Sequence, residues 1–127
     1  MSTSLYLVSS DKITREEGLK FLQDLSAIDV NEQKVSGMIC ELPAVVWVNY
    51  LASFVLEESD EEELAIWRSE LKANPCSFYE LTLGKEGKCM ELAVKIAREG
   101  MRRWNMVVDD LDEMVYTKDN LDLILDP

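Results

Sequence analysis

The apolar residues of this chain switch repeatedly between a period of two and a period of about 3.6 residues. Residues 76–83 alternate and predict a strand, with Phe78, Glu80 and Thr82 opposing Tyr79, Leu81 and Leu83. Residues 88–103 carry a single apolar stripe and predict a helix. Repeated signals of both kinds are typical of layered folds around one core. We therefore expect an α/β or α+β fold, a two-layer sandwich with a mixed sheet of about four to five strands and three to four helices.

Weaker patterns predict the remaining elements. Further strands are expected at residues 4–9, 44–51, 104–109 and 114–116, and further helices from 14, from 60 and over 118–125. A buried helix stays open for 44–51, because short apolar runs do not distinguish the two structures. Residues 29–34 are expected to form a loop, and 35–41 a short strand or an irregular segment. Thr14 with Glu17 predicts a capping box, and Ser59 or Asp60 is expected to cap the helix after it.

Length and composition indicate one soluble domain over residues 1–127. A chain of this size supports a single core, and its 47% hydrophobic residues are typical of globular proteins. The start of the sequence does not resemble a signal peptide, and the longest apolar segment, 42–56, is too short to span a bilayer. Cys40, Cys76 and Cys89 are odd in number and scattered, which favours a reducing cytoplasm and small apolar roles in or near the core.

The sequence offers little for catalysis or for cofactors. It contains no His, the commonest general base and zinc ligand. The segment Gly84-Lys85-Glu86-Gly87-Lys88 matches no phosphate-binding loop, and Asp109 to Glu113 lacks the Gly and Glu that a calcium loop requires. A net charge of −12 disfavours nucleic-acid binding. We expect no enzyme activity, no metal and no cofactor.

Charge distribution is the most informative functional signal. Thirteen of the 25 acidic residues lie in segments 57–63 and 109–126, while Lys95, Arg98 and Arg102 form a separate stripe that can pair with acidic neighbours. The acidic surface serves either solubility or the docking of a basic partner. The predicted partner-binding residues are Glu57, Glu58, Asp60, Glu61, Glu62, Asp109, Asp110, Asp112 and Glu113.

Trp47, Trp67 and Trp104 each fall in the apolar register of an expected element. Core packing is the simplest role for them, because aromatic side chains bury large apolar areas. A half-exposed tryptophan that anchors an interface is the alternative for one of the three.

Four segments together resemble small cytoplasmic immunity proteins that accompany polymorphic or contact-dependent bacterial toxins. They are Leu5-Tyr6-Leu7-Val8 through Thr14-Arg15-Glu16-Glu17, then Val46-Trp47-Val48-Asn49-Tyr50, then Arg103-Trp104-Asn105-Met106-Val107-Val108-Asp109-Asp110, and Val115-Tyr116-Thr117. The resemblance implies a protein that binds one cognate toxin domain, a basic nuclease, and occludes its active site. Such proteins are not enzymes and act in the context of bacterial competition.

Two other functions stay open. An acidic DNA-mimicking regulator, or an adaptor that binds a basic protein, would present the same surface. A small metal-dependent enzyme would require the carboxylates of Asp109 to Glu113 to converge in a pocket. The sequence predicts no particular oligomeric state.

Overall fold

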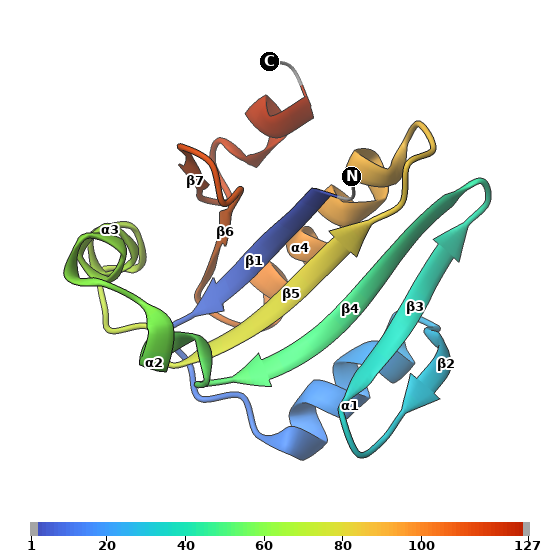
Figure 1. Ribbon diagram of the computed structural model, residues 1–127, viewed down its shortest axis with the longest axis horizontal. Helices are drawn as coiled ribbons and strands as arrows, with labels where there is room; N and C mark the ends of the chain where they lie inside the picture. Colours follow the sequence, from blue (N-terminus) through green and yellow to red (C-terminus); the bar gives the residue numbers. More distant parts are fainter. Residues whose placement is uncertain (1–2, 126–127) are drawn as a thin grey trace.

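One seven-stranded sheet forms the centre of the chain in the computed structural model, which describes residues 3–125 (Figure 1). The strand order is β2-β3-β4-β5-β1-β6-β7, and each neighbouring pair is antiparallel. The strands are β1 (Thr3–Ser9), β2 (Ile28–Asn31), β3 (Ser36–Glu41), β4 (Ala44–Ala52), β5 (Ser77–Leu83), β6 (Met106–Asp109) and β7 (Val115–Tyr116). Within the same range the helices are α1 (Arg15–Asp24), α2 (Val55–Glu58), α3 (Glu61–Leu71), α4 (Cys89–Arg103) and the 3-10 helix η1 (Leu121–Leu125).

The path of the chain explains why neighbouring strands are antiparallel. Helix α4 connects β5 to β6, and these two strands run in the same direction, as expected for a strand–helix–strand unit. Strand β1 lies between them and is antiparallel to both. The α+β class is therefore confirmed. The expected mixed sheet of about four to five strands is wrong, because the insertion of β1 separates the two parallel strands and because β2 and β3 extend the sheet.

The main core lies between the sheet and helices α1 and α4, which cover one face (Figure 1). Alternate residues of the central strands point toward these helices, and α4 contributes the buried residues of its predicted apolar stripe. The Tyr79 hydroxyl donates a hydrogen bond to the Gly18 carbonyl oxygen at 3.1 Å. A Cβ at Gly18 would lie 3.2 Å from that hydroxyl oxygen, so the glycine allows α1 to approach the sheet closely.

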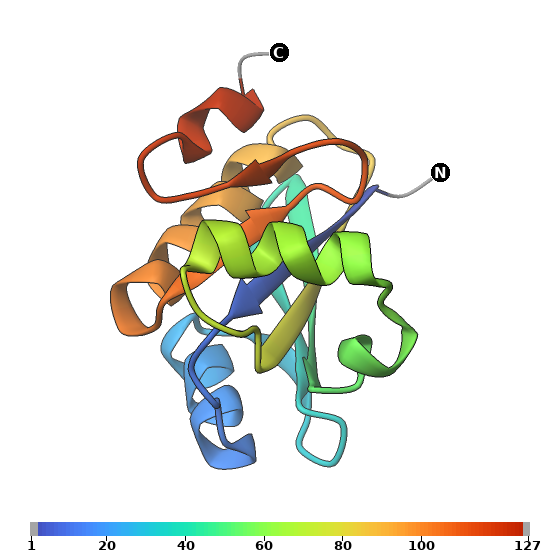
Figure 2. The same ribbon diagram turned by 90° about the vertical axis from the view of Figure 1, so that its left-hand side faces the viewer.

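A second, smaller core lies on the opposite face of the sheet, under α3. It contains Val8, Trp67, Leu71, Phe78 and Val107. The expected two-layer arrangement is therefore incomplete, since α3 adds a partial third layer over β1, β6 and β7 (Figure 2). Among residues 3–125, no helix lies over β3 and β4 on this face (Figure 1).

Local signals located most elements correctly. The capping box of Thr14 and Glu17 starts α1, and a second capping box starts α3, with Asp60 rather than Ser59 as the cap. Residues 44–52 are a strand, so the helix alternative is wrong. The expected loop 29–34 is wrong in part, because β2 occupies Ile28–Asn31, and the last helix is a 3-10 turn that begins only at Leu121. The short helix α2 was not expected.

The tryptophans and cysteines occupy different environments. Trp67 is fully buried, Trp104 is partly buried against the main core, and Trp47 is exposed. Cys89 is buried, whereas Cys40 and Cys76 are partly buried, and all three are free thiols. No helix among residues 3–125 has the length and apolarity needed to cross a bilayer.

Candidate functional site

The fold brings the two acidic segments together although more than 40 residues separate them in sequence. Helix α3 packs beside β6 and β7, which places segment 57–63 next to the loop that joins these strands (Figure 2). A hollow of about 190 Å³ lies between the helix and the loop. It is lined by Glu63, Ile66, Trp67, Asp109, Leu111, Asp112, Glu113, Met114 and Val115. We call the surface formed by residues 57–66 and 109–115 the acidic face.

Trp67 fixes this arrangement. Its side chain is 0% exposed and packs edge-on against Phe78, with 5.2 Å between ring centroids. Its indole Nε1 donates a hydrogen bond to Asp109 Oδ2 at 2.8 Å. Burial of the ring and the bond from its polar edge both tie α3 to β6. The juxtaposition of the acidic segments is thus a consequence of core packing.

Asp109 and Asp110 shape the loop between β6 and β7. Asp109 Oδ1 accepts a hydrogen bond from the Leu111 amide at 2.7 Å. Asp110 Oδ1 accepts from the amides of Asp112, Glu113 and Met114 at 2.9 to 3.1 Å. Both carboxylates were predicted to contact a partner, and the structure gives each of them hydrogen bonds within the loop. Asp112 and Glu113 project from this loop and are exposed.

The acidic residues at the start of α3 also fall into two groups, those that bond within the protein and those that do not. Asp60 Oδ1 accepts from the Glu63 amide at 2.8 Å, and Glu63 Oε1 accepts from the Asp60 amide at 3.2 Å. Glu61 lies 3.9 Å from the Arg68 guanidinium in an exposed ion pair. Among residues 3–125, the side chains of Glu57, Glu58 and Glu62 take part in none of the hydrogen bonds or ion pairs, and all three are exposed.

Three exposed apolar side chains lie within the acidic face. Ile66, Leu111 and Met114 line the hollow and are 50%, 44% and 46% exposed. Protein interfaces typically place apolar anchors at the centre and polar groups at the rim. These residues were not among the predicted partner-binding residues, although Ile66 lies outside the buried stripe of its helix and could have been recognised on that ground.

Tyr6 lies at the inner margin of the acidic face. Partial burial raises the pKa of its phenol, and the carboxylates of Glu80, Glu58, Glu63 and Asp109 raise it further. Glu63 and Glu80 were not among the predicted partner-binding residues. The alternation of residues 76–83 had placed Glu80 on the face opposite Tyr79 and Leu81, which was the available signal.

The basic residues of α4 are paired elsewhere. Lys95 lies 2.9 Å from Glu41, Arg102 lies 2.9 Å from Glu99, and Arg98 pairs with Asp122. The expected pairing of this stripe with acidic neighbours is therefore confirmed. These ion pairs lie away from the acidic face, which keeps its excess negative charge.

The acidic residues form no metal centre within the described part of the chain. No group of three His, Cys, Asp or Glu side chains among residues 3–125 is placed to hold a metal ion.

Comparison of the chain with protein-family models, with curated proteins and with solved structures finds no match.

Proposed function

We propose that this protein binds a basic protein through the acidic face and neutralises it by covering its functional surface. The observation that carries this proposal is the packing of α3 beside β6 and β7, which surrounds Ile66, Leu111 and Met114 with carboxylates from both segments. An apolar centre inside a ring of one charge suits a partner with an apolar contact and a basic rim.

The two parts of the face would act on different steps of binding. The exposed carboxylates of Glu57, Glu58, Glu62, Asp112 and Glu113 would attract a basic surface over long range and increase the association rate. The apolar side chains at the centre would lose contact with water in the complex and slow its dissociation.

We assign the partner to the nuclease domains of bacterial toxins, on the basis of the resemblance to immunity proteins. A nuclease binds a polyanion, so its substrate groove is basic. The carboxylates of the acidic face would occupy positions where substrate phosphates otherwise lie, and the toxin would be blocked without any chemical reaction. An acidic regulator or adaptor for a basic protein that is not a toxin is the alternative, since it would use the same surface.

A pair of matched charge variants tests the proposal. The test variant carries Glu62→Lys, Asp112→Lys and Glu113→Lys, all in exposed residues of the acidic face. The control variant carries Glu16→Lys, Glu32→Lys and Glu86→Lys, exposed residues in α1 and in two loops outside the face. Both change the net charge equally. Glu16 and Glu62 each lie in the first turn of a helix, so the variants also share the loss of a favourable interaction with the helix dipole.

The tagged proteins are used to capture partners from the native cell lysate at about 50 mM and about 300 mM NaCl, since the Debye length falls from roughly 14 to 6 Å over this range. The captured protein is then purified and assayed for cleavage of RNA and DNA. We expect the wild type to capture one basic nuclease more strongly at low salt and to inhibit it. We expect the test variant to bind it at least about tenfold more weakly, and the control variant within about twofold of the wild type.

Two results would change the conclusion. Equal affinity of the wild type and the test variant would exclude the acidic face as the binding surface. A specific partner that is bound through the face but has no toxin activity would favour the regulator or adaptor.

A further inference from the structure

The uncovered half of the sheet carries a second surface that the acidic face does not include. On the side opposite α1 and α4, no helix of the described part of the chain lies over β3 and β4 (Figure 1). The strand register places Met38 opposite Trp47 and Trp47 opposite Thr82, so these three side chains form one row across β3, β4 and β5. Trp47 is 44% exposed in the middle of this row.

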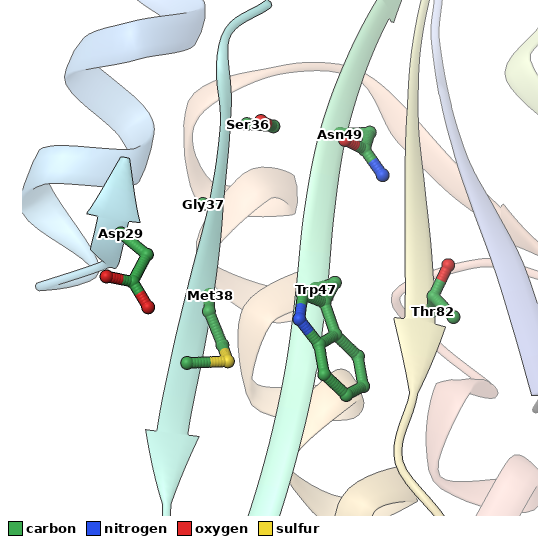
Figure 3. A pocket seen from close by; sticks show the side chains of 7 residues that line it. All are labelled: Asp29, Ser36, Gly37, Met38, Trp47, Asn49 and Thr82. Atoms are coloured by element: carbon green, nitrogen blue, oxygen red, sulfur yellow. The ribbon is translucent and has the colours of Figure 1, made fainter. Parts of the chain in front are cut away.

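A hollow of about 320 Å³ lies around this tryptophan (Figure 3). Figure 3 shows Met38 and Trp47 side by side on neighbouring strands, with Asp29 beyond Met38 and Thr82 beyond Trp47. The complete lining is Asp29, Ser36, Gly37, Met38, Trp47, Asn49 and Thr82. We call it the Trp47 hollow. It combines an aromatic surface with one carboxylate and several neutral polar groups.

An irregularity in β2 accompanies the position of Asp29 in the hollow. Side chains alternate along a regular strand, so Asp29 would lie on the face of the sheet opposite to that of Ile28. The pairing register of β2 shifts between Ile28 and Asn31, and Asp29 has a φ of 52°. Such bulges redirect side chains, and Asp adopts this left-handed conformation more readily than most residues. The Asp29 carboxylate takes part in none of the hydrogen bonds or ion pairs among residues 3–125.

The chemistry of the hollow selects a planar cation. A guanidinium group can stack on the indole of Trp47 and donate hydrogen bonds to the Asp29 carboxylate. A neutral aromatic ligand could stack on the indole but would form no charge-assisted hydrogen bond with that carboxylate. A second copy of this chain is disfavoured, because each copy carries a net charge of −12.

The Trp47 hollow is also connected to the acidic face. The register aligns Asn49 with Glu80, Glu80 with Tyr6, and Tyr6 with Asp109. This polar row crosses the sheet from the hollow to the acidic face over three strand spacings, about 15 Å. One partner surface can therefore reach both sites.

We infer that the Trp47 hollow binds an arginine side chain that projects from a basic protein. This inference rests on the proposed function only in naming a basic protein as the source of the arginine. The hollow itself is defined by Trp47 and Asp29, which lie outside the acidic face, and it is tested with a small probe.

The probe is the tripeptide acetyl-Gly-Arg-Gly-amide, added to the ¹⁵N-labelled full chain and followed by two-dimensional NMR. The same peptide with citrulline in place of arginine is the control ligand, because citrulline keeps the shape of the side chain but has no charge. We expect a saturable shift of the Trp47 indole N–H signal, while the indole signals of Trp67 and Trp104 stay in place. We expect the citrulline peptide to bind about 2- to 5-fold more weakly.

Variants separate the Trp47 hollow from general attraction to an acidic protein. Asp29→Asn should weaken binding of the arginine peptide about 2- to 5-fold, whereas Asp112→Asn, which removes the same charge from the acidic face, should leave it unchanged. Trp47→Leu should abolish binding, and the dispersion of its amide spectrum shows whether it is folded. Asn tolerates the left-handed conformation, so Asp29→Asn should retain the fold.

An unmoved Trp47 indole signal, equal binding of the two peptides, or equal binding to Asp29→Asn and the wild type would overturn the inference. Shifts confined to amides of α3 would likewise overturn it, while leaving the acidic face as a binding surface. Loss of partner binding in the acidic-face variant has no bearing on the peptide result, so failure of the proposed function and failure of the Trp47 hollow are distinguishable.

Discussion

Several acidic residues of the acidic face stabilise the fold in addition to giving the face its negative charge. Asp60 caps α3, Asp109 accepts hydrogen bonds from Trp67 and Leu111, and Asp110 holds the loop after β6. The sequence identified Asp60 as a possible cap, because the spacing of a capping box is local. It could not show the bond between Trp67 and Asp109, which joins residues 42 positions apart.

The hydrogen bond between Trp67 and Asp109 is expected to stabilise the fold. Trp67→Phe removes the N–H donor and leaves Asp109 Oδ2 without it, so the free energy of unfolding should fall by about 1–3 kcal/mol. Urea unfolding of Trp67→Phe, Asp109→Asn and the double variant measures the coupling. Trp104→Phe shows the effect of lost indole volume at a partly buried site. If the two single effects simply add in the double variant, the bond contributes nothing.

Tyr6 should make the protein sensitive to alkaline pH. Its pKa is raised in the folded state above the ordinary value of 10.0, so the unfolded chain loses its phenol proton first as the pH rises. The free energy of unfolding should therefore fall above about pH 10, by at most about 1.4 kcal/mol per pH unit from this group. Tyr6→Phe should lose less stability over the same range, as measured by urea unfolding between pH 8 and 11. A parallel decline of the two proteins would show that Tyr6 titrates normally.

Among the elements, those with a strong local pattern were predictable, and those defined by long-range pairing were not. Strand β5 and helix α4 have clear periods and appear where expected. Strand β2 has only four residues and contains the left-handed Asp29, so its pattern resembles a loop. The insertion of β1 between β5 and β6 has no local signal, because it depends on contacts between distant segments.

Helix α3 provides a test of whether Asp60 serves the fold, the interface or both. Asp60→Ala removes the cap and should lower the free energy of unfolding by about 1 kcal/mol, whereas Asp60→Asn should keep the cap and lose only the charge. Thermal unfolding compares both variants with Thr14→Ala, which removes the matching cap of α1. Equal destabilisation by Asn and Ala would mean that the charge, rather than the capping bond, stabilises the helix.

At the scale of the whole molecule, charge is unevenly distributed. The sequence located the acidic segments, but their contact through α3 and the apolar centre between them required the structure. The exposure of Trp47 could not be predicted from the sequence either. Alternation along β4 shows that Trp47 and Val46 lie on opposite faces of the sheet, but it does not show which face is covered by helices.

Repulsion within the acidic face should make stability depend on salt. Screening weakens repulsion between like charges, so the free energy of unfolding should rise between about 20 mM and about 300 mM NaCl. The variant with Asp112→Lys and Glu113→Lys should gain less from salt than the wild type. The variant with Glu32→Lys and Glu86→Lys has the same net charge and should respond more like the wild type. Identical salt responses in urea unfolding of the two variants would argue against local repulsion.

The position of β1 also determines when the acidic face can form during synthesis. Residues 3–9 leave the ribosome long before their partners in the sheet, residues 77–83 and 106–109. Loop closure over such distances comes late, and the nascent chain lacks a complete central sheet until residue 109 has emerged. The acidic face needs the same late segment. A growing chain therefore presents no finished acidic face, and a partner can bind this face only after residue 115 has been translated.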